Sequence, residues 1–490
     1  ITYKNRHQVI TSTVEAILTH ITAANIFWLS TKCLDFKYDN GDWWAFHRGL
    51  WHKDDKAIRI RRSIAAVLTE HLENTAPGKI QQKNVLLAQN MSFLSGVAQA
   101  VSQDLQEPNF EGTLDLNGDL VGFPGGCVFD VQENAFRTAV RDDLISKTTK
   151  WEYREPTESE VANLNVFLMG LVSDGTGTGA GTDTELLTYL LMLLSATTFS
   201  VQRIHQFVNI FGVASNGKSK LTFLMMKLLG DYFKVIPFEC LSNSNSNGDA
   251  ASPHLAGCGG VRMLCSSEPE TTHKIGSVIK KYSGGDEYTT RANYGNPKTF
   301  TVTFHWYVLS NGACEFKSVD AGIKRRSRQI EFETEFVDVP EPTNPRQRQI
   351  DANLDSKMAG MVPALFKLLL HYLPMVKACP GNSIQPIPDR VLLTSSDRTG
   401  SDHTDRLQAL LETNCTSING DEDTPSTISE IYNLIPDWWK ISRREMENNM
   451  TLLGYNKVRE TNGPPGTRDT KRCWKHEDGS LLKKANLLVI

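Results

Sequence analysis

Residues 211–220 read Phe-Gly-Val-Ala-Ser-Asn-Gly-Lys-Ser-Lys, and this stretch decides how the rest of the chain is interpreted. The segment from Gly212 to Ser219 fits G-x-x-x-x-G-K-[ST], the pattern of a phosphate-binding loop (P-loop). Such a loop follows a buried strand and opens a helix. Both are predicted here, as an apolar strand at 207–211 and an apolar helix at 219–229. The motif therefore predicts a nucleotide-binding site, with phosphates held by backbone N–H groups at the helix N-terminus.

Individual loop residues have predicted parts in holding the nucleotide. Lys218 would reach the β- and γ-phosphates of ATP, and the hydroxyl of Ser219 would coordinate Mg²⁺. A chance match in a long chain is the alternative, and the flanking strand and helix argue against it. The predicted ATP-binding residues are Gly212, Val213, Ala214, Ser215, Asn216, Gly217, Lys218, Ser219 and Lys220.

Hydrolysis requires more than a P-loop, and candidate residues follow two later predicted strands. The strand at 261–265 is followed by Glu268 and Glu270, which are candidates to hold Mg²⁺ and activate water, with Glu268 the nearer metal ligand. The strand at 302–309 is followed by Asn311, which can orient water and contact the γ-phosphate. An acidic turn and an ordinary Asn-Gly turn are the respective alternatives. Because ligands bind at the carboxyl ends of parallel strands, these residues are expected beside the P-loop.

A basic run at 324–328 precedes the last predicted strand, at 329–332. Either Arg325 or Arg326 can serve as an arginine finger that stabilises the transition state in a neighbouring subunit. A solvated face, a localisation signal or a phosphate patch are the alternatives for such a run. The spacing alone does not choose between the two arginines.

Strand-like and helical segments alternate from about residue 200 to 332, which predicts a parallel, helix-covered sheet. A linker is predicted at 337–345 and a helix at 351–376. The glycine-rich stretch 175–181 resembles a dinucleotide fingerprint but follows no suitable strand, so a loop is predicted. The predicted strands are 207–211, 235–238, 261–265, 302–309 and 329–332.

Composition limits the class of protein. The 490 residues are 40% apolar and 22% charged, which is typical of a globular chain of about three domains. The net charge of −4 means that any DNA site must be a local patch. Nine cysteines occur singly, so reduced thiols in an intracellular compartment are expected. No signal peptide is recognised, and the most apolar stretch, 186–194, is predicted to be a buried helix rather than a membrane span.

The two ends of the chain contain weaker signals. A Trp-rich segment at 42–51 predicts a small β-hairpin whose aromatic side chains pack internally, with base stacking as the less favoured alternative. Short strands are predicted within 114–130. The chain begins with Ile1 rather than Met, so a fragment of a longer protein is expected.

The C-terminal segment 428–490 predicts two helices and then a hairpin with its tip at 462–466. Ser442 begins a capping box, and Arg443 and Arg444 follow in the first turn, where the helix dipole disfavours cations. This conflict, and the basic character of the segment, favour a winged-helix DNA contact over subunit packing.

The order and spacing of these motifs resemble superfamily 3 helicases, and more narrowly the poxvirus-type and phage or plasmid helicase–primases. Residues 279–286 read Ile-Lys-Lys-Tyr-Ser-Gly-Gly-Asp, which is similar to the family segment after the acidic strand, and Arg291 follows at the family spacing. Arg325-Arg326 with Ile330-Glu331-Phe332 is similar to the final family motif. The resemblance implies a ring, commonly a hexamer, with ATP between subunits and single-stranded DNA in the pore. It also implies a DNA-gripping hairpin near 294–298, and the DNA-binding candidates are Lys280, Arg291, Lys298, Arg443 and Arg444.

The expected fold class is α/β: an AAA+-like parallel-sheet ATPase core, a mixed α/β N-terminal helicase-associated domain and a C-terminal winged-helix-like domain. The expected boundaries are 1–195, 196–376 and 377–490. The expected function is a Mg²⁺- and ATP-dependent replicative DNA helicase of a virus, phage or mobile element. An origin-binding assembly protein that does not unwind DNA and a P-loop phosphotransferase are the alternatives.

The expected partners are single-stranded DNA, replication forks, further copies of the chain, a primase domain or protein, and a replicative polymerase. No membrane partner is expected. The expected location is the host-cell cytoplasm or a viral replication site.

Overall fold

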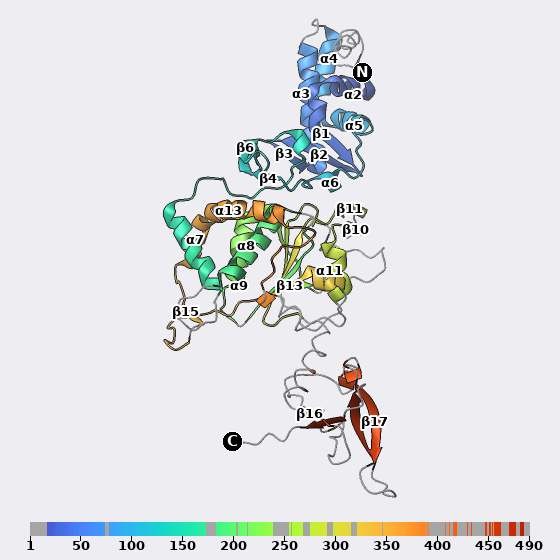
Figure 1. Cartoon of the computed structure of the whole chain (residues 1–490). Coiled ribbons are helices and arrows are strands. Elements are labelled where there is room, and N and C mark those ends of the chain that lie inside the picture. The colour runs from blue at the N-terminus through green and yellow to red at the C-terminus, as the bar shows by residue number, and fades with distance from the viewer. Residues whose placement is uncertain are drawn as a thin grey trace.

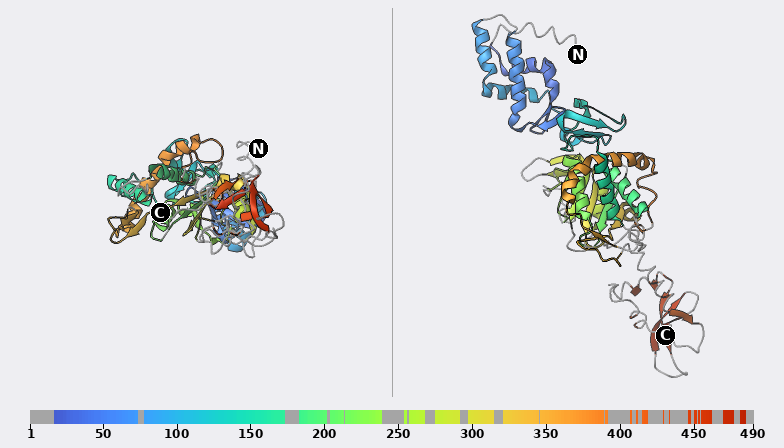
Figure 2. Two further views of the ribbon diagram at one scale, coloured as in Figure 1. Left: turned by 60° about the horizontal axis from the view of Figure 1, so that its bottom comes forward. Right: turned by 90° about the vertical axis from the view of Figure 1, so that its left-hand side faces the viewer.

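The structure is a computed structural model. It describes the chain from residue 17 onward, apart from 74–77, 173–182, 202–203, 213, 239–253, 256, 268–274, 292–296, 315–320, 345, 389, 392–406, 408–410, 412–414, 419–428, 430–432, 434–445, 448–449, 452, 454, 462–469, 477–480 and 485–490. Figures 1 and 2 show an N-terminal group of helices and small sheets, a central α/β part and a C-terminal sheet. The central part contains the predicted nucleotide site.

A five-stranded parallel sheet forms the centre of the α/β part, as predicted. Its spatial order is β13-β7-β12-β9-β8, and every neighbouring pair is parallel. The strands are β7 (Phe207–Phe211), β8 (Phe233–Val235), β9 (Met263–Ser267), β12 (His305–Ser310) and β13 (Ser327–Glu331). In this order β12 lies between the P-loop strand β7 and the strand β9 that precedes the predicted acids. The carboxyl ends of all three therefore meet at one edge of the sheet.

Helices cover both faces of this sheet (Figure 1). One face shares a hydrophobic core with four helices, and the other packs against two shorter ones. The first group is α7 (Glu158–Leu171), α8 (Thr184–Thr198), α9 (Lys218–Leu229) and α13 (Leu354–Ala378), and the second is α11 (Ile275–Ser283) and α12 (Ala321–Arg326). Because α7 and α8 belong to the core of the sheet, buried contacts cross the predicted boundary at 195.

The strand before the predicted acids begins at Met263, two residues later than expected. Arg262 lies outside the strand and forms hydrogen bonds with residues that are distant in the sequence. Its backbone N–H donates to Tyr232 O at 2.8 Å, and its guanidinium donates to Thr198 O at 2.7 Å and Leu120 O at 2.6 Å. The side chain is only 1% exposed and stacks over the Tyr232 ring. Arg262 thus satisfies two buried carbonyl groups from separate segments, which joins the end of α8 to the N-terminal part of the chain.

The apolar stretch 186–194 lies in α8 and is buried, as predicted, except for the half-buried Leu187 and Thr188. The helix α13 begins three residues later and ends two residues later than the predicted 351–376 segment, and it is long and apolar enough, by length and composition alone, to cross a membrane. Half of its most apolar window is buried inside the protein, and it packs against α7, α8 and α9. The predicted linker 337–345 connects a short parallel pair, β14 (Glu335–Val337) and β15 (Gln347–Gln349).

The buried His305 at the start of β12 gives the core a predicted pH dependence. Burial lowers its pKa to about 4, and its Nδ1 lies 2.8 Å from Thr197 Oγ1. The unfolded chain would take up this proton near pH 6.5, so the stability present above that pH is lost as the pH falls toward 4. We expect the free energy of unfolding to fall by about 2 kcal/mol between pH 7.5 and pH 5 from this group. Urea unfolding at both pH values should show a smaller difference for His305→Asn, and an unchanged difference would contradict this assignment.

The N-terminal part contains two small antiparallel sheets and a helical group. The Trp-rich hairpin is present as predicted, and Trp43, Trp44 and Trp51 are 8%, 7% and 2% exposed, so internal packing is confirmed. Short strands also occur within 114–130, as predicted. The sheets are β1 (Phe36–Asp39), β2 (Asp42–His47) and β3 (Leu50–Lys53), and β4 (Leu120–Phe123), β5 (Cys127–Asp130) and β6 (Ala135–Thr138). The helices are α2 (His20–Leu29), α3 (Ile58–Glu73), α4 (Lys79–Ala88), α5 (Met91–Ser102) and α6 (Phe110–Thr113).

The described C-terminal residues form an antiparallel sheet of order β16-β19-β18-β17. Its longest pair flanks the predicted hairpin tip, which lies outside the described residues. Met446 and Met450 are buried, in agreement with the predicted apolar helix face. The winged-helix arrangement remains a prediction. The strands are β16 (Cys415–Ile418), β17 (Tyr455–Thr461), β18 (Thr470–His476) and β19 (Leu481–Lys484).

Candidate nucleotide-binding site

The site lies at the carboxyl edge of the central sheet. Phe211, the last residue of β7, pairs with Ser310 on one side and Glu331 on the other. Ser267, the last residue of β9, pairs with Leu309. The segments that leave β7, β9, β12 and β13 therefore start side by side, as expected for a ligand site in an open parallel sheet.

The P-loop adopts a conformation that requires its two glycines. Gly212 and Gly217 have φ of +141° and +85°, in the region that L side chains rarely adopt. A Cβ on Gly212 would lie 2.3 Å from Phe332 O, and a Cβ on Gly217 would lie 2.3 Å from Leu171 Cδ2. The side chain of Asn216 donates to Phe332 O at 3.2 Å. The loop is thus fixed against the end of β13 and the end of α7.

Lys218 is the first residue of α9, and its ammonium lies across the loop. It is 8% exposed, and its Nζ donates to Gly212 O at 2.6 Å. Ser219 is exposed one position later, and Ala214 and Ser215 are exposed in the loop itself. The loop thus combines two glycines with positive φ, a helix N-terminus, a lysine and a serine hydroxyl. Together these groups suit a phosphate with a bound Mg²⁺. Val213 lies outside the described residues.

Lys220 lies away from the P-loop, although the sequence placed it among the ATP-binding residues. Its ammonium forms an ion pair with Asp355 at the start of α13. Residues two positions apart on a helix do not face the same side, so Lys218 and Lys220 diverge. The side chain of Lys220 therefore links two helices rather than completing the loop.

Asn311 follows β12 directly and is exposed at the same edge as the P-loop. The position agrees with a role near the γ-phosphate, which remains a prediction. Glu268 and Glu270 lie outside the described residues, one and three positions beyond the end of β9. Among the described residues, no group of three or more His, Cys, Asp or Glu side chains could hold a metal ion.

A buried polar network that sequence reasoning missed holds this edge together. The side-chain amide of Asn209, in the middle of β7, forms hydrogen bonds with Ser310 Oγ at 2.9 Å and with the Gln329 side-chain amide at 3.1 Å. Gln329 in turn bonds both backbone groups of Cys314, at 2.8 and 2.9 Å. The network ties the loop that contains Asn311 to β7 and β13. An Asn inside the otherwise apolar strand Phe207–Phe211 was the available signal.

The two predicted finger arginines lie at the amino ends of the strands, opposite the end of the sheet that holds the P-loop. Arg325 and Arg326 end α12, and the next residue, Ser327, pairs with Phe207 at the start of β7. Since a strand rises about 3.3 Å per residue, roughly 13 Å of strand separate this edge from the P-loop. Arg325 is exposed, whereas Arg326 is half-buried and donates to Gly322 O at 3.2 Å.

The surroundings of these arginines are themselves charged. Burial and then the charges of Arg326 and Arg325 lower the pKa of His205, whereas Asp286 opposes this shift. His205 lies two residues before the start of β7. The guanidinium groups thus gather at the amino edge of the sheet, away from the P-loop of their own chain.

A hairpin is present near the predicted position, as β10 (Glu287–Arg291) and β11 (Pro297–Thr301), and its contact with DNA stays a prediction. Lys280 lies on α11, whose next residue, Lys281, stacks over Tyr288 of the hairpin. The tip at 292–296 lies outside the described residues, as do Arg443 and Arg444. Of Arg291 only the backbone is described, paired with Pro297.

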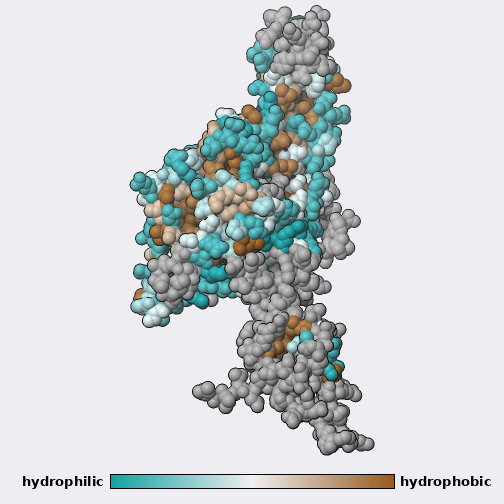
Figure 3. Space-filling view, viewed as in Figure 1, coloured by the Kyte–Doolittle hydropathy of each residue, from teal (hydrophilic) through white to brown (hydrophobic). Residues whose placement is uncertain are grey.

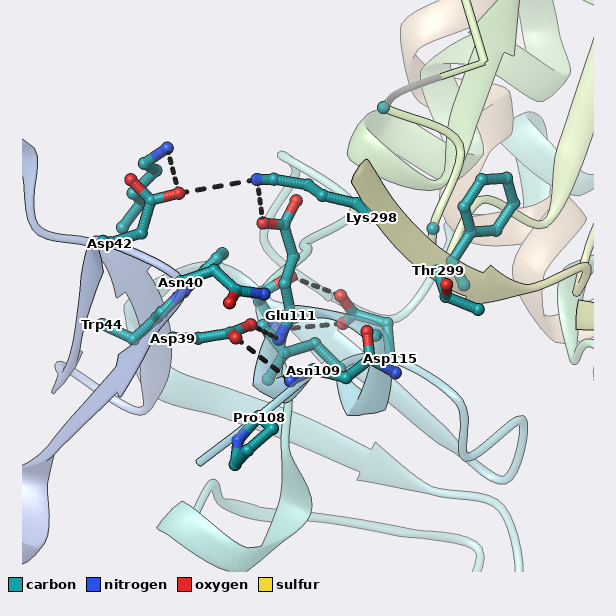
Figure 4. A pocket seen from close by; sticks show the side chains of 18 of the residues that line it. Asp39, Asn40, Asp42, Trp44, Pro108, Asn109, Glu111, Asp115, Lys298 and Thr299 are labelled. Carbon is teal, nitrogen blue, oxygen red and sulfur yellow. Dashed lines mark hydrogen bonds and ion pairs between the residues drawn. The ribbon is translucent and has the colours of Figure 1, made fainter. Parts of the chain in front are cut away.

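Lys298 has acidic partners in the N-terminal part of the chain, and its contact with a DNA phosphate stays a prediction. It forms an ion pair with Glu111 and lies 3.6 Å from Asp42 Oδ2 (Figure 4). Burial opposes its charge, but Glu111 and then Asp42 raise its pKa above the ordinary value. A DNA phosphate at Lys298 would have to displace these carboxylates.

These residues line a cavity of about 790 Å³ between the N-terminal sheets and the hairpin (Figure 4). Its buried carboxylates already have local partners. Asp39 accepts backbone N–H groups of Asn109 and Glu111, and Asp115 accepts from Ser146. The cavity is a seam between two parts of the chain, and the Lys298 ion pairs connect its walls.

Comparisons with known proteins agree with the motifs. The chain is 30% identical over 372 residues to "Putative helicase L207/L206" of Acanthamoeba polyphaga mimivirus, covering 70% of the chain and 38% of that protein. It is 25% identical over 233 residues to "Putative helicase 022R" of Frog virus 3, covering 46% of the chain and 23% of that protein. No family model matches the sequence. In sequence, the chain is viral helicase-like, and it spans well under half the length of either relative.

Among solved structures, the chain is similar to apo structures of the NrS-1 C-terminal region. One match covers 84% of this chain and 83% of that one, with a TM-score of 0.45 and 12% identity. A second, to residues 305–718 of the same protein, covers 90% and 88% with the same TM-score and identity.

Proposed function

We propose that the chain is the ATPase and translocation part of a replicative DNA helicase from a virus, phage or mobile element. It hydrolyses ATP with Mg²⁺ and moves along single-stranded DNA as a superfamily 3, AAA+-like ring, commonly a hexamer. ATP lies between adjacent subunits. Replication forks, a primase and a replicative polymerase are the proposed partners, in the host-cell cytoplasm or a viral replication site.

The observation that carries this proposal is the separation of the P-loop from Arg325 and Arg326. The two groups lie at opposite edges of one sheet, so a chain cannot bring its own arginines to its own P-loop without disrupting β13. An arginine near the γ-phosphate accelerates phosphoryl transfer strongly when it comes from a second molecule. This requirement is satisfied by a ring in which the amino ends of the strands in one subunit face the carboxyl ends of the strands in the adjacent subunit.

The chain's own residues have distinct roles in this proposal. Lys218 holds the terminal phosphates, Ser219 and Glu268 hold Mg²⁺, and Glu268 or Glu270 orients the attacking water. Asn311 detects the γ-phosphate. When bound, ATP would supply the phosphoryl group and Mg²⁺ would neutralise charge on the phosphate oxygens, and the preorganised charges of these residues would stabilise the transition state.

The direct test measures ATP turnover and strand separation with the same preparation. We expect the 490-residue chain to hydrolyse ATP slowly alone, faster with single-stranded DNA, and to separate a forked duplex only with ATP and Mg²⁺. A P-loop phosphotransferase would turn over ATP without a response to DNA. An assembly protein would bind the fork without separating its strands, and either result would refute the proposal.

A further inference from the structure

The start of α3 has an unusual concentration of positive charge. Arg59, Arg61 and Arg62 are the second, fourth and fifth residues of the helix, and its first turn contains no acidic residue. Cations at a helix N-terminus are disfavoured by the helix dipole. The buried Asp54 carboxylate lies just before the helix, but it accepts the backbone N–H groups of Arg59 and Ile60, each at 2.9 Å.

Arg61 has a structural role, whereas its neighbours do not. Arg61 donates to Ala57 O at 3.0 Å, to Lys56 O at 2.8 Å and to Ser95 Oγ at 3.1 Å. In contrast, Lys56, Arg59 and Arg62 are exposed, and no described residue forms an ion pair or a hydrogen bond with their side chains. Arg59 and Arg62 are three positions apart, so their side chains are neighbours on the helix surface.

The β2–β3 turn adds a further arginine, Arg48, which like Arg59 lies near enough to His47 to lower its pKa. β3 leads into α3 through a single short turn, and α3 also contacts β2 (Figure 1). Arg48 and Gly49 form the two-residue turn with φ of +52° and +77°, the geometry of a type I′ hairpin. Asn or Gly is preferred at the first of these positions, so Arg48 is placed there against local backbone preference. It too is exposed, and no described residue forms an ion pair or a hydrogen bond with its side chain.

The turn is held in place rather than loose. A Cβ on Gly49 would lie 2.5 Å from Gly126 Cα, so the turn rests directly on the backbone of the second small sheet. His47 and His52 face the same charges: after burial, Arg59 and Arg48 lower the pKa of His47, and Arg59 lowers that of His52. No carboxylate offsets these shifts. The exposed acid that lies nearest to these cations in the sequence is Asp55, which directly precedes Lys56.

We propose that Arg48, Lys56, Arg59 and Arg62, here called the basic face, bind the phosphate backbone of duplex DNA without reading its sequence. The choice of DNA among polyanions rests on the proposed function. Exposed cations without ion pairs, on a fixed surface, suit phosphates. Because the net charge of the chain is −4, any electrostatic attraction to DNA must come from a local basic patch of this kind.

Duplex is favoured over single-stranded DNA because proteins that grip single strands stack bases on aromatic side chains. The three hairpin tryptophans are buried in the core and cannot do so. On the face of the molecule in Figure 3, hydrophobic surface lies in patches among hydrophilic residues. The basic face therefore recognises charge, and DNA duplex outside a central pore is its ligand.

The test uses the full chain and a fluorescent random-sequence duplex without single-stranded tails. Affinity is measured between 50 and 200 mM salt for wild type, R59E/R62E and the milder R59Q/R62Q. A matched control, K357E/K367E, reverses the half-buried Lys357 and the exposed Lys367, which pair with Asp351 and Glu155. Because each lost phosphate contact lowers the salt slope by about one, we expect the slope of R59E/R62E to fall by about two. The control should keep the wild-type slope, and ATP turnover without DNA should be unchanged in all variants.

An unchanged salt slope in both arginine variants, with native circular dichroism, would overturn the proposal. So would an equal loss in K357E/K367E, which would indicate a general charge effect. The outcome is separable from the proposed function. If wild type fails to unwind a fork while R59E/R62E still loses duplex affinity, the proposed function fails and the basic face stands.

Discussion

Replacing Lys218 with alanine is expected to reduce ATP turnover by at least about 100-fold, since removing a single preorganised donor to a developing negative charge costs about 10²–10³ in rate. The ammonium already lies within the loop, bonded to Gly212 O, so it needs little movement to reach a phosphate. Its side chain is largely buried, and no other described lysine of α9 faces the loop. Lys220 pairs with Asp355, and Lys227 lies over the Phe223 ring.

Lys227→Ala is the matched control, because it removes a lysine from the same helix without touching the P-loop. Steady-state ATP turnover with saturating single-stranded DNA measures the effect, and urea unfolding shows whether each variant stays folded. Turnover by a folded Lys218→Ala within a few-fold of wild type would contradict the assignment of the site.

The second large effect concerns the arginines at the amino edge of the sheet. We expect the double variant Arg325→Ala/Arg326→Ala to lose about 10³-fold or more of ATP turnover, the scale of a missing arginine finger. Its own P-loop is intact, so it should still bind ATP. The single variants then rank the two residues, and the greater exposure of Arg325 favours it as the one that reaches a neighbour.

Mixing this double variant with Lys218→Ala tests whether sites are shared. Each chain alone is inactive, but an interface with Lys218 from one variant and the arginines from the other is complete. In a ring assembled at random from equal amounts, about a quarter of interfaces would be complete, so turnover should recover toward that fraction. No recovery at any mixing ratio, with subunit exchange verified, would refute a shared site.

The sequence alone predicted the P-loop, its strand and helix, and the parallel sheet, because these depend on local pattern. Gly212 and Gly217 are required by backbone conformation, and β7 is a short apolar run between turn residues. The limits of β9 were less predictable, because Arg262 is buried by contacts with residues distant in sequence. Such contacts leave no periodic signal.

The side-chain partners of site residues were not predictable for the same reason. Lys298 pairs with Glu111, far away in the chain, and Lys220 with Asp355. The placement of Arg325 and Arg326 opposite the P-loop depends on the position of β13 next to β7 in a parallel sheet. A sequence gives the order of strands along the chain and leaves their order in space to packing.

The central claim is that ATP is cleaved between two copies of this chain and that DNA controls the reaction. The most direct measurement is turnover per chain against protein concentration, with and without single-stranded DNA, with mass determined by light scattering in the same samples. We expect turnover to rise as oligomers form and to rise further with DNA. A monomer that hydrolyses ATP at one constant rate, with or without DNA, would contradict the account.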